Sequence, residues 1–368
     1  MPLEQDRLHM TRALELARRG LYSTPPNPAV GCVLVRDDRI VGEGYHRSAG
    51  GPHAEVFALQ AAGEAARKAT AYVSLEPCAH FGRTPPCTRA LLAAGIARVV
   101  CALRDPNPDV AGGGLAELAR AGVEVEDGVL AAEAAELNRG FVRRMSRGRP
   151  WVTVKLAASL DGRTALANGT SRWITDEESR ADVQRLRARA SAIVTGIGTV
   201  LADDPSLTVR DAALDLGGRR PLRVVVDSRL RLPASARVLD AAAPTLVVTT
   251  QAGTNAIALE ARGARVETLA ARDGRVDPAA LLERLAALQC NEVLVEAGST
   301  LAGSLLAQGL VDELVLYIAP CVLGDAAQPM FRLPVVARME ERHDFRLLDS
   351  VRFGQDLRVT LRPVAEGR

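Results

Sequence analysis

Three side chains in the first quarter of the sequence have the types and spacing of a zinc site. His53 opens a His-Ala-Glu sequence, Cys78 follows Pro77, and Cys87 comes after eight intervening residues. One imidazole and two thiolates give Zn²⁺ three protein ligands and leave its fourth position open, which is typical of catalytic zinc sites. Such a site lowers the pKa of a bound water and supplies a nucleophile at neutral pH.

The carboxylate two residues after the histidine suits a proton carrier. When water attacks a ring carbon that bears an amino group, protons must reach the ring nitrogen and the departing ammonia. Glu55 stands where this general acid/base is needed. The signature of nucleobase deaminases is H-x-E followed by P-C-x-x-C, although here eight residues instead of two lie between the cysteines. The pattern therefore predicts a zinc-dependent hydrolytic deaminase.

The same residues have other interpretations. An isolated His-x-Glu is common, and two cysteines at this spacing are compatible with small buried hydrophobes. A purely structural zinc site would need a fourth ligand, which His80 offers, but it would leave Glu55 without a role. The other four cysteines lie in or beside apolar runs and are interpreted as packing residues: Cys32, Cys101, Cys290 and Cys321.

The elements predicted around these residues belong to an α/β sandwich, with helices packed on a mixed sheet. Apolar residues at helical spacing predict a first amphipathic helix around residues 10–21. Strands are predicted at 30–35, 40–44, 72–74, 98–103 and 123–125, and helices at 53–62, 88–94 and 115–121. His53 would then begin a helix, Cys78 would follow a strand, and Cys87 would precede a helix whose N-terminus favours the thiolate.

A polar stretch at residues 146–150 that ends in Gly and Pro predicts a domain boundary. It divides the 368 residues into domains at 1–146 and 150–368, each large enough for its own core. Strands are predicted in the second domain at 152–156, 192–195, 223–226, 245–248, 292–295 and 313–318, and helices at 176–189, 278–288 and 301–308. This repeated strand–helix–strand order predicts a largely parallel sheet.

Two glycine-containing turns, at residues 195–199 and 296–303, each follow a predicted strand. Small residues at the start of a helix let backbone N–H groups approach a phosphate, and two such turns suit a ligand across the sheet edge. Taken alone, each is equally an ordinary strand-to-helix turn. Arg187 and Arg210 are candidate clamps for a sugar phosphate, although most arginines in this Arg-rich chain are expected to be solvated.

The overall composition argues against nucleic-acid or membrane binding. The net charge is +2 and aromatic residues make up 3% of the chain, too little for a basic or stacking surface. The basic residues between 143 and 149 are interpreted as a solvated linker. Charged residues interrupt the N-terminal segment, and no run approaches the roughly 18 apolar residues of a membrane span. A cytoplasmic protein is expected.

On these motifs the chain closely resembles the bifunctional riboflavin-biosynthesis deaminase/reductase family. The long segment between the two cysteines, with its Thr-Pro-Pro-Cys ending, is particularly specific. The matching segments span nearly the whole chain and lie at residues 26–31, 53–55, 77–87, 105–110, 155–162, 171–175, 201–208 and 296–298.

The resemblance implies two consecutive reactions and two folds. A cytidine-deaminase-like first domain would bind Zn²⁺ and deaminate a diamino-pyrimidinone ribosyl phosphate by hydrolysis. A second domain of dihydrofolate-reductase type, with a mostly parallel sheet and flanking helices, would use NADPH to reduce the ribosyl group to ribityl. A homo-oligomer joined through the reductase domain is also implied.

The resemblance also assigns residues. In the first domain it assigns zinc binding to His53, Cys78 and Cys87 and proton transfer to Glu55. Substrate contacts fall on Asn27, His46, His80, Arg83 and Asn107, although some members have lysine where this chain has Arg83. In the second domain it assigns the dinucleotide to Ala157, Trp173, Thr199, Asp203, Ser228, Gly298, Ser299, Thr300, Leu301, Ala302, Gly303 and Ser304. It assigns the reductase substrate to Ser171, Arg187, Leu207, Arg210 and Glu296, and Lys155 is a further active-site charge.

Three other functions were weighed against this one. A nucleic-acid base deaminase with an accessory domain is disfavoured by the near-neutral charge and the scarcity of aromatic residues. A non-enzymatic zinc-stabilised binding protein would not need Glu55. A chain in which only one domain is active remains open, although both motif sets are intact.

Overall fold

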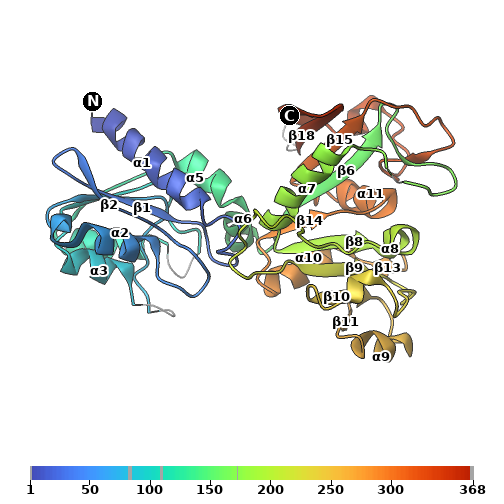
Figure 1. Cartoon of the computed structure of the whole chain (residues 1–368), viewed down its shortest axis with the longest axis horizontal. Helices are drawn as coiled ribbons and strands as arrows, with labels where there is room; N and C mark the ends of the chain where they lie inside the picture. The colour runs from blue at the N-terminus through green and yellow to red at the C-terminus, as the bar shows by residue number, and fades with distance from the viewer. Residues whose placement is uncertain (1, 82–84, 108–110, 172, 365–368) are drawn as a thin grey trace. The chain divides into compact units, whose positions relative to one another are not determined.

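The structure is a computed structural model that describes residues 2–81, 85–107, 111–171 and 173–364. The chain forms two compact units. The first contains residues 1–148 together with 215–219, and the second contains residues 149–214 and 220–368. Figure 1 shows the helices and strands of both units along the chain.

The first unit is a sheet with helices on both faces. Its strands are β1 (Gly31–Arg36), β2 (Arg39–Tyr45), β3 (Thr70–Val73), β4 (Arg98–Cys101) and β5 (Glu124–Asp127). Its helices are α1 (Pro2–Arg18), α2 (Ala54–Ala62), α3 (Cys87–Ala93), α4 (Gly113–Arg120), α5 (Ala131–Leu137) and α6 (Arg139–Arg147), with a short 3₁₀ turn η1 (Gly63–Ala66).

The strand order in the first unit is β2-β1-β3-β4-β5. Strand β1 pairs antiparallel with both neighbours, whereas β3, β4 and β5 are parallel, so the sheet is mixed. Apolar residues of α1 and α5 pack on one face of the sheet. Residues of α2, α3 and α4 pack on the other face. The predicted α/β sandwich is confirmed.

Close contact between α2 and β2 depends on a glycine. A Cβ added to Gly44 would lie 2.3 Å from the carbonyl oxygen of Ala54, the first residue of α2. Any side chain at this position would therefore displace the start of the helix. Because His53 immediately precedes that helix and Glu55 lies in its first turn, this contact fixes the distance of both residues from the sheet.

The basic residues near the boundary are helical, which the sequence did not predict. Arg143, Arg144 and Arg147 belong to α6, so the expectation of a linker is wrong for these residues. Phe141, on the same helix, is buried. The helix ends at Gly148, which adopts a left-handed conformation with φ 66°.

The second unit is built on a larger sheet. The strands of this unit are β6 (Trp151–Ser159), β7 (Arg163–Ala165), β8 (Ala192–Gly196), β9 (Leu222–Val226), β10 (Thr245–Thr249), β11 (Arg265–Thr268), β12 (Ala271–Arg272), β13 (Arg275–Val276), β14 (Glu292–Val295), β15 (Glu313–Ala319), β16 (Gln328–Pro329), β17 (Phe345–Phe353) and β18 (Asp356–Pro363). The helices are α7 (Glu177–Arg189), α8 (Ile197–Asp203), α9 (Asn255–Glu260), α10 (Pro278–Ala287) and α11 (Ser299–Ala307), with 3₁₀ turns η2 (Arg237–Leu239) and η3 (Met339–Glu341).

Nine strands form the main sheet in the order β11-β10-β9-β8-β14-β6-β15-β18-β17. All pairings from β11 to β15 are parallel, and the hairpin β17–β18 joins β15 in antiparallel orientation. Alternate residues of the strands face the two sides of the sheet. One side packs against α10 and α11, and the other side packs against α7, α8 and α9. The predicted mostly parallel sheet is confirmed.

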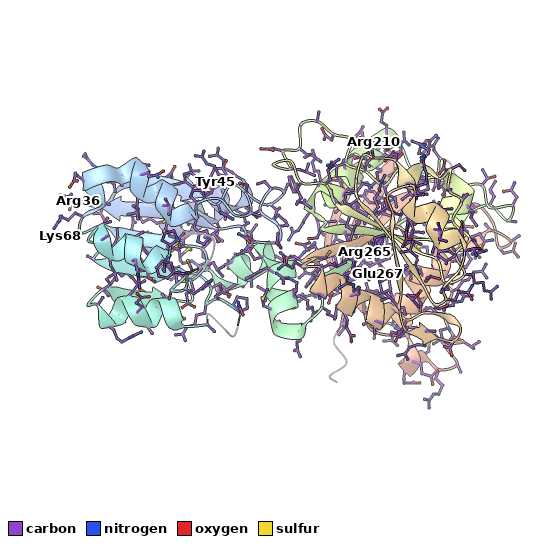
Figure 2. The ribbon with its side chains drawn as sticks, turned by 90° about the horizontal axis from the view of Figure 1, so that it is seen from below. Arg36, Tyr45, Lys68, Arg210, Arg265 and Glu267 are labelled. Atoms are coloured by element: carbon purple, nitrogen blue, oxygen red, sulfur yellow. The ribbon has the colours of Figure 1, made fainter. Side chains whose placement is uncertain are left out.

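One outer edge of this sheet carries charged side chains. Figure 2 shows Arg265 and Glu267 close together on β11, where they form an ion pair. Glu267 also accepts hydrogen bonds from Arg284 of α10 at 2.7 and 3.0 Å. Charges on an edge strand oppose pairing with another chain.

In the described part of the chain, none of the helices has the length and hydropathy of a membrane span.

Candidate active sites

The three predicted zinc ligands lie together in the first unit. The imidazole nitrogen Nδ1 of His53 lies 3.2 Å from Sγ of Cys87 and 3.6 Å from Sγ of Cys78. The three ligand atoms are all within 4.8 Å of one another, and among the described residues this is the one group of three or more side chains able to hold a metal. The structure brings together residues separated by up to 34 positions in the chain.

Local structure explains how the two cysteines meet. Cys78 follows β3 through a short turn, and Cys87 is the first residue of α3. The backbone N–H of Cys87 donates to Sγ of Cys78 at 3.4 Å, so the start of a helix faces the sulfur. Hydrogen bonds from Cys87 and His53 outweigh burial and lower the pKa of the Cys78 thiol. The pair therefore holds one thiolate even before a metal deprotonates the second thiol.

The donor set fits a catalytic zinc ion. His80 is exposed and does not belong to the cluster, so the described residues provide three ligands and no fourth. Cys32, Cys101 and Cys290 are fully or almost fully buried, as expected of packing residues. A three-ligand N/S/S site leaves one position for water or substrate.

Glu55 has the environment of a proton carrier. Its side chain is 3% exposed, and its buried Oε2 atom has no hydrogen-bond partner among the described residues. Burial raises the pKa of this carboxyl group, although the neighbouring His53 opposes the shift. A carboxyl group whose pKa is raised holds and releases a proton more readily near neutral pH. Its Oε2 atom can therefore form a hydrogen bond with a bound water or substrate.

Two predicted substrate residues lie beside the metal ligands. Nδ2 of Asn27 is 3.2 Å from Nε2 of His46, and Nδ1 of His46 is 3.0 Å from the carbonyl oxygen of Pro52. The rings of His46 and His53 meet edge to face with centroids 5.4 Å apart. Burial lowers the pKa of His46, which favours its neutral form. These polar groups line one side of the cluster.

The remaining predicted deaminase residues are less tightly placed. Asn107 is half-buried in the loop that follows β4, and His80 is exposed in the segment between the two cysteines. Arg83 lies outside the residues that the structure describes.

Two supporting residues were missed in the sequence. Asn138 is 5% exposed and both donates to and accepts from the backbone of Ala29, at 2.9 and 2.8 Å, which fixes the segment that carries Asn27. Glu76, which directly precedes the Pro-Cys pair, accepts hydrogen bonds from the loop that contains Asn107. Position next to the cysteine was the only signal for Glu76, and nothing near Asn138 indicated its role.

In the second unit, the predicted residues gather where parallel strands end. Lys155 and Ala157 lie in the second half of β6, Thr199 lies in the helix after β8, and Ser228 and Glu296 follow β9 and β14. Because these four strands are parallel neighbours, their carboxyl ends share one edge of the sheet. Ligands of open α/β sheets bind at this edge.

A buried cluster of charges forms the centre of this edge. Arg187 donates to the two carboxylate oxygens of Glu296 at 2.6 and 3.0 Å, and also to the carbonyl oxygen of Thr208 at 3.0 Å. Burial opposes the charge of Glu296, but Arg187 outweighs it and lowers the pKa of the carboxyl group. Burial lowers the pKa of the neighbouring Lys155, while Glu296 partly opposes that shift.

This cluster changes how the two arginines are interpreted. Arg187 is held by Glu296 in a bidentate pair in which each side chain is 12% exposed. Arg210, by contrast, is exposed and is labelled in Figure 2. Of the two candidate phosphate clamps, Arg210 therefore has the accessible guanidinium.

Further contacts join residues predicted to bind the dinucleotide. The backbone N–H of Gly298 donates to Oγ1 of Thr199 at 3.2 Å, which links the turn before α11 to α8. The hydroxyl of Ser171 donates to Asp203 at 2.8 Å. The two glycine-containing turns identified in the sequence therefore lie side by side, with the exposed Gly298 at their junction.

The other predicted residues have varied surroundings. Leu207 is buried, Ser228 accepts a hydrogen bond from the backbone N–H of Val276 at 3.0 Å, and Trp173 is 71% exposed beside Arg180. Within the turn and helix at 298–304, Gly298 and Thr300 are exposed, Leu301 and Ser304 are half-buried, and Ser299, Ala302 and Gly303 are buried. Exposed backbone at a helix start is suited to a phosphate, so the donors present fit a dinucleotide.

Comparisons with known proteins match both parts of the chain. The family model described as "Cytidine and deoxycytidylate deaminase zinc-binding region" matches residues 3–103, and the model described as "RibD C-terminal domain" matches residues 150–359. The chain is 48% identical over 362 residues to the riboflavin biosynthesis protein RibD of Escherichia coli, covering 96% of this chain and 98% of that protein.

Solved structures resemble the whole chain. RibD of Acinetobacter baumannii, form 2, has a TM-score of 0.92 at 46% identity, covering 99% of this chain and 100% of that one. A diaminohydroxyphosphoribosylaminopyrimidine deaminase/5-amino-6-(5-phosphoribosylamino)uracil reductase of Thermotoga maritima has a TM-score of 0.86 at 33% identity, covering 99% and 100%.

Proposed function

The chain belongs to the RibD family of bifunctional riboflavin-biosynthesis deaminase/reductases, and from this premise we propose which of its residues carry out each reaction. The enzyme uses Zn²⁺ and NADPH. We assign deamination of 2,5-diamino-6-ribosylamino-4(3H)-pyrimidinone 5′-phosphate to residues 1–146 and reduction of the ribosyl group to ribityl to residues 150–368. The division into two compact units near residue 148 supports this assignment.

The deaminase assignment rests on one observation. The ligand atoms of His53, Cys78 and Cys87 lie within 4.8 Å of one another, and the buried Oε2 atom of Glu55, two residues after His53, has no hydrogen-bond partner in the described part of the chain. We propose that these three residues hold zinc, which when bound activates water as a nucleophile. Glu55 then transfers protons to the pyrimidine nitrogen and to the leaving ammonia.

Around this centre, side chains of the chain bind and orient the pyrimidine. Asn27 and His46 present neighbouring amide and imidazole groups, whose hydrogen bonds select a ring with exocyclic polar groups. Asn107 supplies a further amide, and His80 and Arg83 lie in the segment between the cysteines, where they are assigned to the ribosyl phosphate end. Arginine presents a planar fork where some relatives have a lysine, so the phosphate contact differs in geometry.

In the second unit, NADPH when bound supplies a hydride to the sugar carbon. We assign its phosphates to the exposed backbone at Gly298 and the start of α11, and its remaining contacts to Ala157, Trp173, Thr199, Asp203, Ser228, Ser299, Thr300, Leu301, Ala302, Gly303 and Ser304. Arg210 binds the substrate phosphate, and the Arg187–Glu296 pair, with Lys155, orients the sugar. Ser171 and Leu207 complete the substrate wall.

We also propose a cytoplasmic homo-oligomer joined through the second unit. The C-terminal segment exposes several large apolar side chains, and β17 is an edge strand whose backbone is open to pairing. These exposed side chains are Val322, Val335, Met339, Leu347, Leu348 and Leu357. A cytoplasmic location suits an enzyme that depends on reduced cysteines and NADPH. Sedimentation of the purified protein tests the oligomer, and a monomer would contradict it.

The mass of the product tests the function. The diamino-pyrimidinone ribosyl phosphate is incubated with zinc-loaded protein, with and without NADPH. Exchange of an amino group for oxygen without NADPH, and two further hydrogens only with it, is the expected result. Exchange without added hydrogens would refute the reductase assignment. No change in either sample would refute the deaminase assignment.

A further inference from the structure

A buried carboxylate next to the metal ligands holds a loop of the first unit in place. Glu76 is 4% exposed and lies between the end of β3 and Cys78. Its backbone N–H donates to the carbonyl oxygen of Leu103 at 2.9 Å, so its main chain is tied to the strand end of β4. The side chain of Glu76 then extends toward the segment that follows β4 and contains Asn107.

Among the residues that the structure describes, four backbone N–H groups of that segment donate to the Glu76 carboxylate. Oε2 accepts from Asp105 at 3.1 Å and from Gly112 at 3.0 Å. Oε1 accepts from Gly114 at 2.9 Å and from Leu115 at 3.2 Å. Two of these donors belong to the start of α4, where a negative charge is stabilised by the helix dipole.

These contacts bracket Asn107. The N–H of Asn107 donates to Oδ1 of Asp105 at 2.9 Å, and its carbonyl oxygen accepts from Ala111 at 2.9 Å. At the far end of the segment, a Cβ on Gly114 would lie 1.9 Å from the carbonyl oxygen of Pro77, so the two backbones touch. Glu76 therefore fixes Asn107 relative to the residue that precedes the metal ligand Cys78.

We infer that Glu76 is a positioning residue for deamination, which sets the substrate-binding Asn107 at a fixed distance from the zinc ligands without touching the substrate itself. The inference rests on the proposed deaminase function. It extends that function because it places substrate affinity under the control of a residue outside the binding site.

The inference explains why the residue must be a carboxylate. Both oxygens accept two N–H groups each, so no orientation of an amide would satisfy all four donors. In Glu76→Gln, the NH₂ group would face two backbone N–H groups, and these donors would be left unpaired. Buried donors without partners destabilise the arrangement that contains them. The segment around Asn107 is therefore expected to loosen.

Steady-state deamination by Glu76→Gln tests this inference, with Glu133→Gln as a control at an exposed carboxylate of the same unit. We expect KM to rise about tenfold or more in Glu76→Gln, with kcat changed much less, because the loss falls on substrate binding. Zinc content and NADPH-dependent reduction by the second unit should match the control. A fall in kcat at unchanged KM, or loss of zinc, would indicate a merely structural role and overturn the inference.

A double-mutant comparison separates positioning from general damage. If Glu76 acts through Asn107, the effect of Glu76→Gln on KM should largely disappear in an Asn107→Ala background. Full additivity of the two effects would contradict the inference. In addition, amide hydrogen exchange should quicken at Asp105, Gly112, Gly114 and Leu115 in Glu76→Gln, and unchanged exchange would refute the contacts themselves.

The exchange measurement needs no substrate, so it distinguishes the two proposals. Failure of the wild-type protein to deaminate the pyrimidine would refute the proposed function, whatever the exchange rates are. Wild-type activity with an unchanged KM in Glu76→Gln would refute only the role of Glu76.

Discussion

Replacing Glu296 by Gln should impair reduction and shift its pH dependence. The side chain of Glu296 is 12% exposed and pairs with Arg187 through two hydrogen bonds of 2.6 and 3.0 Å. Glutamine retains the shape and one acceptor but loses the charge and the second acceptor. Arg187 would keep its hydrogen bond to the carbonyl oxygen of Thr208 but lose one of its two hydrogen bonds to the side chain at position 296.

The magnitude follows from the lost charge-assisted hydrogen bond. Such bonds contribute about 1.5–3 kcal/mol, and solvent screening is small because both partners are nearly buried. We therefore expect kcat/KM for reduction to fall by about ten- to a hundredfold. The KM for NADPH should change less, because the exposed backbone at Gly298 is left intact.

The direction of the pH shift follows from Lys155. Burial already lowers the pKa of this ammonium group, and Glu296 opposes that effect. Without the Glu296 charge the pKa of Lys155 falls further. A protonated Lys155 provides a cation for the anionic substrate, so activity is lost as the pH rises through this pKa. In Glu296→Gln the loss should begin at lower pH than in the wild type.

NADPH oxidation measured across the alkaline pH range tests this prediction. Glu292→Gln is a matched control, because Glu292 pairs with Arg189 at 2.8 Å at the amino end of β14, whereas Glu296 follows the carboxyl end of that strand. The control should keep the wild-type pH profile. An unchanged profile in Glu296→Gln, or the same shift in Glu292→Gln, would refute the role assigned to this charge cluster.

Three further predictions concern the framework of the two units. Burial lowers the pKa of His9 below its usual 6.5, although the negative charge of Asp6 opposes this shift, so the unfolded chain binds a proton more readily than the folded chain. The free energy of unfolding should therefore fall as the pH drops below 6.5. Urea unfolding of His9→Gln should show a weaker dependence on pH, and an identical dependence would contradict this. Gly44→Ala should destabilise the first unit by about 1–3 kcal/mol and weaken zinc retention. Gly113→Ala is the control, because a Cβ at this position meets nothing within 4 Å. Equal melting temperatures of the two variants would refute the close contact at Gly44. Arg223→Met removes a fully buried guanidinium that donates hydrogen bonds to Asp240 and Thr245. The free energy of unfolding of the second unit should fall by about 3–5 kcal/mol while deamination persists. An unchanged midpoint in a denaturant titration would contradict this.

The sequence was most informative where chemistry and element ends coincide. His53 immediately precedes α2 and Cys87 begins α3, so short-range patterns correctly placed both residues at the starts of helices. Strands of the parallel sheet were also predicted, because strands buried on both faces consist of continuous apolar runs such as those of β9 and β10.

Other features depend on contacts between distant residues. The hairpin β17–β18 was missed because β17 is mostly exposed and contains Asp349 and Arg352, so no buried face produces an alternating pattern. Its pairing with β15, not its own composition, defines it. Asn138 binds the backbone of Ala29, 109 residues away, and no local pattern predicts such a pair.

In the proposed deaminase site, a zinc cluster with Glu55 as proton carrier deaminates the pyrimidine. The most direct test is deamination by zinc-loaded Glu55→Gln, with zinc content and NADPH-dependent reduction measured on the same sample and Glu133→Gln as a control. We expect Glu55→Gln to retain zinc and reductase activity and to lose deamination. Deamination that survives in this variant would contradict the role of Glu55.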